Sequence, residues 1–163
     1  MSSRLALLDR DGTLIEHVHY LSDPAQVRLL PGTVEGLRQL RQRGYTLVMV
    51  SNQSGVGRGY FSIEIVEAVN LQMQQMLLAS GAPLDLLLYC PHSPQANCGC
   101  RKPNPGMAEQ ACRHFQTTLE GALVVGDSDC DMDLAVNLKL PGYRLGSPQL
   151  PRLDLLPALL DQT

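Results

Sequence analysis

Short, continuously apolar segments alternate with amphipathic segments along this chain, and this alternation constrains the fold more than any other feature. An apolar run predicts a strand that is buried on both faces, and such strands form parallel sheets with helices on each side. We predict strands at residues 4–8, 45–50, 84–89, 122–125 and 143–145. Apolar spacing and helix breakers predict helices at residues 32–43, 62–80, 105–115, 131–138 and 153–160. The predicted fold class is therefore α/β, a three-layer, doubly wound parallel sheet.

The size and composition of the chain exclude several classes of protein. Its 163 residues match one domain over residues 1–163, and the hydrophobic fraction of 44% is enough to fill a core. The excess of 16 acidic over 13 basic residues gives a net charge of −3, which argues against a nucleic-acid or anionic-membrane binder. No segment approaches the roughly 18 apolar residues that cross a bilayer, and the start of the chain is typical of a strand, not of a signal peptide. We therefore expect a cytoplasmic monomer without nucleic-acid or membrane partners.

Two carboxylates follow the first predicted strand, at the edge of a parallel sheet where ligands bind. Asp9 and Asp11 belong to the segment Asp-Arg-Asp-Gly-Thr, and residues two apart on an extended chain face the same way. Carboxylates that project together repel one another unless a cation lies between them or one holds a proton, and both arrangements serve phosphoryl transfer. We predict Mg²⁺ at this pair, Asp9 as the nucleophile on phosphorus, and Asp11 as acid and base. A surface turn rich in Asp and Gly is the alternative.

Other polar residues after the predicted strands also suit a phosphate group. The hydroxyl of Ser51 and the loop N–H groups after it can hold phosphate oxygens, and Lys102 can neutralise a transferring phosphoryl group. Asp127 follows the fourth strand and is placed to hold the metal, with Asp131 supporting it from the first turn of the next helix. Each residue has a simpler interpretation on its own, namely a polar loop, a solvated lysine or an acidic helix cap.

Four potential metal ligands fall within the short loop at residues 90–100. Cys90 and His92 lie on one side of five intervening residues, and Cys98 and Cys100 lie on the other. Three thiolates and one imidazole make the closed tetrahedral set that structural zinc prefers. We predict Zn²⁺ in a structural role, ordering the loop and setting the residues after it beside the carboxylates. Free thiols and a loop histidine are the alternative.

In their order along the chain, these segments resemble the four motifs of the haloacid dehalogenase superfamily of phosphatases, over about residues 4–140. The matching residues are Asp9-Arg10-Asp11-Gly12-Thr13, then Ser51, then Lys102, then Gly126-Asp127 with Asp131. The resemblance implies a Rossmann-like core, a nucleophilic Asp9, an acid and base at Asp11, and Asp127 as a Mg²⁺ ligand. It also implies that the backbone carbonyl of Asp11 contacts the ion and that Ser51 and Lys102 hold the phosphoryl group.

The cysteine–histidine loop resembles a zinc-loop branch of that superfamily. The branch contains D-glycero-D-manno-heptose 1,7-bisphosphate phosphatases and histidinol-phosphatases, which generally lack a large cap domain. The roughly 20 residues between Gly12 and Gly32 are indeed too few for a cap. Residues 51–61 and 104–107 look more like the heptose enzymes, whereas Ile15 and Glu16 look more like the histidinol enzymes. The resemblance to the heptose enzymes implies substrate contacts by Asn52, Gln53, Ser54, Arg58 and Arg101.

The function expected from these motifs is a Mg²⁺-dependent phosphomonoesterase that acts on a small phosphorylated metabolite through an aspartyl-phosphate. The leading substrate is the heptose 1,7-bisphosphate used in lipopolysaccharide-core precursor synthesis, and histidinol phosphate is the alternative. Two other classes remain open: a zinc-loop interaction module on a degenerate phosphatase fold, and a phosphotransferase that passes the group to another alcohol. The complete set of Asp9, Asp11, Lys102 and Asp127 favours the phosphatase over the interaction module.

Overall fold

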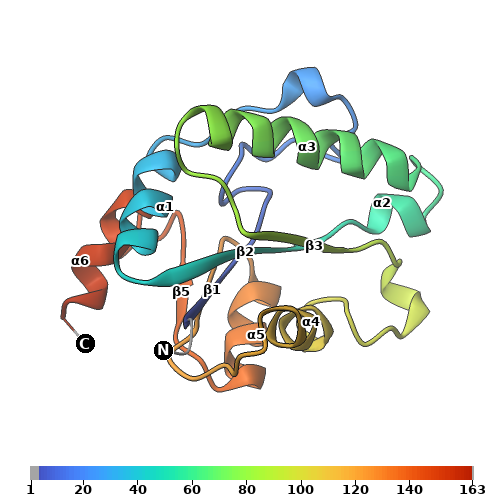
Figure 1. Cartoon of the computed structure of the whole chain (residues 1–163). Helices are drawn as coiled ribbons and strands as arrows, with labels where there is room; N and C mark the ends of the chain where they lie inside the picture. Colours follow the sequence, from blue (N-terminus) through green and yellow to red (C-terminus); the bar gives the residue numbers. More distant parts are fainter. Residues whose placement is uncertain (1–3, 163) are drawn as a thin grey trace.

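A five-stranded parallel sheet lies between two layers of helices in the computed structural model, which describes residues 4–162 (Figure 1). The strand order is β3-β2-β1-β4-β5, so β1 lies at the centre. The strands are β1 (Arg4–Leu8), β2 (Tyr45–Asn52), β3 (Leu86–Cys90), β4 (Leu123–Gly126) and β5 (Gly142–Arg144). The predicted fold class is confirmed.

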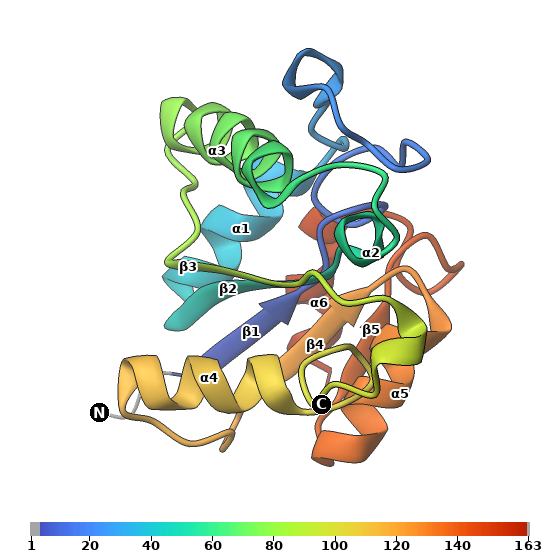
Figure 2. The same ribbon diagram turned by 90° about the vertical axis from the view of Figure 1, so that its right-hand side faces the viewer.

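The helices divide between the two faces of the sheet. The face that packs against α1, α3 and α6 is opposite the face that packs against α4 and α5 (Figures 1 and 2). The α-helices are α1 (Thr33–Gln42), α2 (Ser54–Gly57), α3 (Ile63–Ala79), α4 (Gly106–Phe115), α5 (Asp129–Leu138) and α6 (Leu156–Leu160). Short 3-10 turns are η1 (Pro24–Gln26), η2 (Pro94–Ala96) and η3 (Leu153–Leu155).

The central strand shows why the apolar segments are continuous. Ala6 and Leu8 of β1 face the core beneath α1 and α3, whereas Leu5 and Leu7 face the core beneath α4 and α5. Alternate side chains of a strand point to opposite faces, so a strand covered on both sides needs apolar residues at every position.

The direction in which the strands are added reverses beside β1. The chain runs outward from β1 to β2 and β3, and then returns to place β4 on the other side of β1. The loops that leave β1 and β4 therefore diverge, and parallel sheets bind ligands in the crevice outside the carboxyl ends of such strands. The backbone N–H of Asp9 donates to the carbonyl of Val125 at 3.0 Å, which fixes the end of β1 against β4.

Differences from the sequence-based prediction are confined to short elements and ends. The four residues of α2 were expected to be a loop, because two of them are glycines with low helix propensity. The predicted closing helix is divided into η3 and α6, and Pro157 lies in the first turn of α6, where its missing N–H would have no partner anyway. No helix within residues 4–162 is long and apolar enough to cross a membrane.

Candidate active site

A cavity of about 360 Å³ opens at the carboxyl edge of the sheet, between the loops that follow β1, β2 and β4. Figure 2 shows these strand ends pointing toward α2 and the loop after β3. Residues predicted to act together from distant parts of the sequence line this cavity. They are Asp9, Asp11, Asn52, Gln53, Ser54, Arg101, Lys102 and Asp127.

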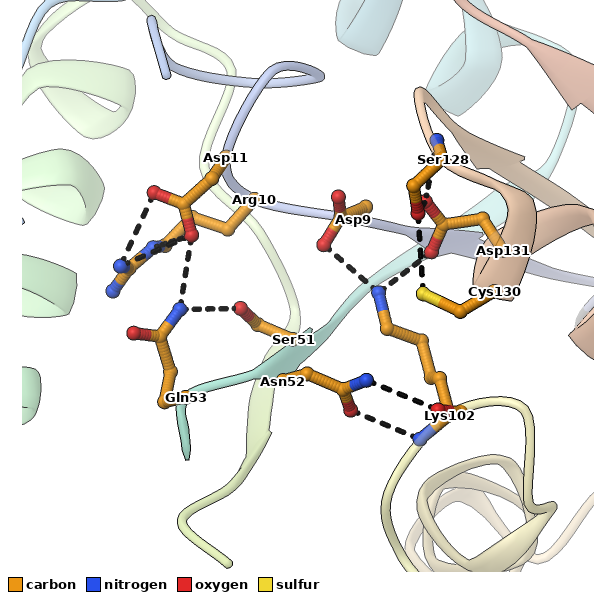
Figure 3. Close-up of polar contacts among 10 residues, drawn as sticks. All are labelled: Asp9, Arg10, Asp11, Ser51, Asn52, Gln53, Lys102, Ser128, Cys130 and Asp131. Atoms are coloured by element: carbon orange, nitrogen blue, oxygen red, sulfur yellow. Dashed lines mark hydrogen bonds and ion pairs between the residues drawn. The ribbon is translucent and has the colours of Figure 1, made fainter. Parts of the chain in front are cut away.

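Lys102 lies at the floor of the cavity as a buried cation. Its Nζ is 2.8 Å from Oδ1 of Asp9 and 2.7 Å from Oδ1 of Asp131, and the residue is only 3% exposed (Figure 3). Burial alone would lower the pKa of Lys102, but the two carboxylates raise it above its ordinary value. The lysine is therefore charged, and it is not the solvated surface lysine of the alternative interpretation.

Three carboxylates converge beside this lysine in an arrangement that can hold a divalent cation. Oxygens of Asp9, Asp127 and Asp131 all lie within 4.8 Å of one another. Burial raises the pKa of Asp9, Lys102 lowers it and Asp131 raises it, and the net result is a pKa of about 7. One ammonium group does not balance three carboxylates, and hard oxygen ligands of this kind suit Mg²⁺.

Gly12 lets Asp127 approach the loop after β1. A Cβ atom at residue 12 would lie 2.0 Å from Oδ2 of Asp127, and the φ angle of +78° is in the left-handed region that favours glycine. The glycine of the first motif is thus required both by the turn and by the carboxylate that comes from β4.

Asp131 both caps a helix and contacts the site. Its Oδ2 accepts hydrogen bonds from the backbone N–H and the hydroxyl of Ser128, at 3.2 and 2.7 Å, which completes a capping box at the start of α5. Its Oδ1 accepts from Lys102 (Figure 3). The capping interpretation and the supporting role are therefore compatible, because each uses a different oxygen.

Asp11 points away from the acidic cluster, unlike the expectation that its carboxylate would project together with that of Asp9. Both oxygens of Asp11 lie about 3.2 Å from the guanidinium of Arg10, and Oδ2 also accepts from Gln53 at 2.9 Å (Figure 3). The arginine between the two aspartates and the turn at Gly12 break the extended geometry on which the expectation depended. The third carboxylate of the cluster is that of Asp131, and not that of Asp11.

The residues at the end of β2 contact the site in two different ways. The side-chain amide of Asn52 accepts from the N–H of Lys102 at 2.9 Å and donates to its carbonyl at 3.1 Å, so it holds the backbone of the lysine (Figure 3). The Ser51 hydroxyl is fully buried and accepts from Gln53 at 2.8 Å. Ser54 and Arg101 line the cavity, whereas Arg58 is exposed and is not among its lining residues.

The cysteine–histidine loop forms a second cluster that can hold a metal ion. The Sγ atom of Cys90 lies 3.5 Å from that of Cys98, 3.2 Å from that of Cys100 and 3.3 Å from Nδ1 of His92. Ligands at about 2.0–2.3 Å from one tetrahedral zinc ion are separated by only slightly more than these distances. Burial and the neighbouring thiols raise the pKa of Cys90 to about 12, so a cation is needed to hold it as a thiolate.

Two glycines allow this cluster to pack against the helices beside the cavity. The N–H of Gly57 in α2 donates to the carbonyl of Pro91 at 2.8 Å, and a Cβ there would lie 2.4 Å from the backbone nitrogen of Ser93. The N–H of Gly106 donates to the carbonyl of Gly99 at 2.9 Å, and a Cβ there would lie 2.5 Å from that oxygen. The loop is therefore clamped between α2 and α4, immediately before Arg101 and Lys102.

Sequence reasoning missed the segment at residues 17–21, which also lines the cavity. The Tyr20 ring makes edge contacts with the rings of His19 and Tyr60, at centroid distances of 4.4 and 4.7 Å. The run His-Val-His-Tyr, in the loop that follows the Asp-Arg-Asp-Gly-Thr motif, is the sequence feature that could have indicated a contribution to the site. Cys130, to which no role was assigned, also lines the cavity.

The chain is similar to a known protein family and to several named relatives. Residues 4–141 match the family model described as polynucleotide kinase 3 phosphatase. The D-glycero-beta-D-manno-heptose-1,7-bisphosphate 7-phosphatase of Pseudomonas aeruginosa is 36% identical over 83% of this chain and 76% of its own. A probable enzyme of that name from Thermoplasma acidophilum is 37% identical over 85% of this chain and 87% of its own.

A solved structure is similar over almost the whole length. The D,D-heptose 1,7-bisphosphate phosphatase from B. bronchiseptica, complexed with magnesium and phosphate, superposes with a TM-score of 0.84 and is 30% identical, covering 98% of this chain and 99% of that one. The fold, the family match and these relatives thus define a phosphatase, and the segment Asp-Arg-Asp-Gly-Thr follows its first strand. The chain belongs to the haloacid dehalogenase superfamily, within the family described as polynucleotide kinase 3 phosphatases.

The contact between Asn52 and the Lys102 backbone leads to a stability prediction. Replacing the amide in Asn52→Leu removes two hydrogen bonds, each of which contributes about 1 kcal/mol, so we expect the free energy of unfolding to fall by about 1–3 kcal/mol. Asn137→Leu is a matched control, because exposed Asn137 makes one hydrogen bond to the carbonyl of Pro103. Denaturant unfolding of both variants measures the difference, and equal losses would contradict the positioning role of Asn52.

Proposed function

We propose that this protein is a Mg²⁺-dependent phosphomonoesterase that acts through an aspartyl-phosphate on Asp9. The observation that carries the proposal is the buried Lys102 between Asp9 and Asp131, with Asp127 completing an acidic cluster at the floor of the cavity. An anionic ester enters such a site only if positive charge compensates the carboxylates. When bound by Asp9, Asp127 and the backbone carbonyl of Asp11, Mg²⁺ supplies that charge.

The residues divide the reaction into two proton-balanced steps. A carboxylate oxygen of Asp9 attacks phosphorus, the bond to the sugar oxygen breaks, and the carboxylic acid of Asp11 gives its proton to the leaving oxygen. The ionised Asp11 then takes a proton from a water molecule that attacks the aspartyl-phosphate, which releases phosphate and restores both groups. Lys102 holds Asp9 in place and neutralises the phosphoryl group. The Ser51 hydroxyl and the N–H groups at the start of α2 donate hydrogen bonds to the phosphoryl oxygens.

For the substrate we propose D-glycero-D-manno-heptose 1,7-bisphosphate, hydrolysed at the 7-phosphate. The names of the relatives from P. aeruginosa and T. acidophilum and of the B. bronchiseptica structure support this choice. A cavity of about 360 Å³ suits a small sugar better than a polymer. Arg101 lines this cavity, and its Nη1 atom is buried without a hydrogen-bond partner. A buried cationic donor of this kind can bind an anionic group of the substrate.

Histidinol phosphate is the second candidate substrate, favoured by Ile15 and Glu16 after the nucleophile motif. Both compounds are small phosphate monoesters, so the chemistry at Asp9 is the same for either. Comparing kcat/KM for the two compounds decides between them, and a higher value for histidinol phosphate would overturn the heptose assignment.

We further propose that Cys90, His92, Cys98 and Cys100 bind one structural Zn²⁺. The four ligand atoms already lie within 4.8 Å of one another, and no position remains open for a substrate. A single domain, a monomeric state and a cytoplasmic location stay predictions; the free thiols of the cluster suit a reducing compartment. A role in lipopolysaccharide-core synthesis depends on the heptose substrate.

The nucleophile is tested by Asp9→Asn. An amide cannot form the acyl-phosphate, so we expect turnover to fall below detection while the thermal unfolding midpoint stays within a few degrees of the wild type. The amide is nearly isosteric with the carboxylate and still offers Lys102 an oxygen. Steady-state phosphate release and circular dichroism give the two readouts, and retained activity in the folded variant would refute the nucleophile assignment.

The zinc site is tested by elemental analysis of protein purified without added metal. We expect about one zinc per chain, because a closed set of three thiolates and an imidazole binds it tightly. Cys98→Ser should lower the zinc content and the unfolding midpoint, whereas Cys112→Ser, outside the cluster, should leave the zinc content unchanged. Wild-type protein without zinc would reject the site.

A further inference from the structure

Arg10, the residue between the two catalytic-motif aspartates, has a buried guanidinium that the proposed reaction does not use. The residue is 1% exposed, although it lies at the edge of the catalytic cavity. Its Nε and Nη2 atoms donate to the two carboxylate oxygens of Asp11, both at 3.2 Å (Figure 3). Two parallel bonds of this kind fix the plane of the carboxylate as well as its position.

Asn70 of α3 anchors the same guanidinium from the other side. Nη1 of Arg10 donates to Oδ1 of Asn70 at 2.8 Å. Asn70 is buried on the face of α3 that otherwise presents apolar residues to the sheet. A polar residue at a core position of a helix is costly unless it is paired, so this asparagine has its partner in Arg10.

Gln53 holds the carboxylate of Asp11 from the end of β2. Its Nε2 atom donates to Oδ2 of Asp11 at 2.9 Å and to the hydroxyl of Ser51 at 2.8 Å (Figure 3). The carboxylate of Asp11 therefore lies between an arginine fixed to α3 and a glutamine fixed to β2. Neither contact is needed to hold the sheet together, because β1 and β2 pair along their backbones.

We propose that Arg10, anchored by Asn70, is a positioning residue that orients the Asp11 carboxyl group for proton transfer. The inference rests on the proposed function, in which Asp11 protonates the leaving oxygen. Proton transfer depends on alignment of donor and acceptor, and a displacement of about 1 Å can cost a factor of about 100 in rate. The bidentate contact, the buried anchor and the cavity position together provide that alignment.

The test exploits the leaving group. The heptose 7-alkoxide is a strong base that needs a proton as it departs, whereas p-nitrophenolate is a weak base that departs without one. Arg10→Lys keeps the charge but loses the two parallel bonds. We expect this variant to lower kcat/KM for heptose 1,7-bisphosphate about 10-fold or more and kcat/KM for p-nitrophenyl phosphate less than about 3-fold.

Asn70→Ala removes the anchor of the guanidinium and leaves both charged residues, Arg10 and Asp11, unchanged in sequence. We expect the same pattern with a smaller loss, and this variant decides the question if Arg10→Lys does not fold. Gln74→Ala is the matched control, because Gln74 lies one turn further along α3 and its amide bonds the backbone of Leu84, away from the cavity. Gln74→Ala should affect both esters equally, through stability alone.

Parallel losses with the two esters, or unchanged kcat/KM in both variants, would overturn the positioning role. A failure of the proposed function is distinguishable from these outcomes, because Asp9→Asn would then retain its activity with both esters. Both esters are assayed with the whole chain at saturating Mg²⁺. A difference between their kcat/KM losses therefore reflects the orientation of Asp11 and not a change in metal binding.

Discussion

The ammonium group of Lys102, buried between Asp9 and Asp131, is the interaction on which the rest of the site depends. Loss of this lone ammonium group would leave the carboxylates around it uncompensated, which costs several kcal/mol in proteins generally. The same contacts join three parts of the fold: the end of β1, the loop before α4 and the first turn of α5. Three carboxylates lie beside this one ammonium group, so the cluster keeps an excess of negative charge. The proposed magnesium ion and the cationic side chains of the cavity would compensate that excess.

Lys102 is held from outside the acidic cluster by backbone contacts. Asn52 pairs with both backbone polar groups of the lysine, and the cysteine–histidine loop immediately precedes it in the chain. That loop has few apolar residues of its own, but Gly57 and Gly106 let it pack closely on α2 and α4. The proposed zinc ion would therefore affect the reaction indirectly, because it would fix the backbone position of the loop that precedes Lys102.

Much of this architecture could be predicted from the sequence, because it depends on local patterns. Continuous apolar strands, glycine stops and helical spacing predicted the parallel sheet, and strand ends predicted that Asp9, Lys102 and Asp127 would meet. The orientation of Asp11 could not be predicted, since it depends on Arg10 and on Asn70, which is 60 residues away. The segment at residues 17–21 was missed for a similar reason, because a loop carries no periodicity that shows where it folds back.

Chemical trapping can show whether Asp9 carries the phosphoryl group as an acyl-phosphate during turnover. Borohydride reduces an acyl-phosphate to an alcohol, so enzyme quenched during turnover and reduced should contain homoserine at position 9, detected by peptide mass spectrometry. We expect this product only when substrate and Mg²⁺ are both present, and we expect none in Asp9→Asn. Turnover without any reduction product at position 9, or with the product at another carboxylate, would contradict an aspartyl-phosphate on Asp9.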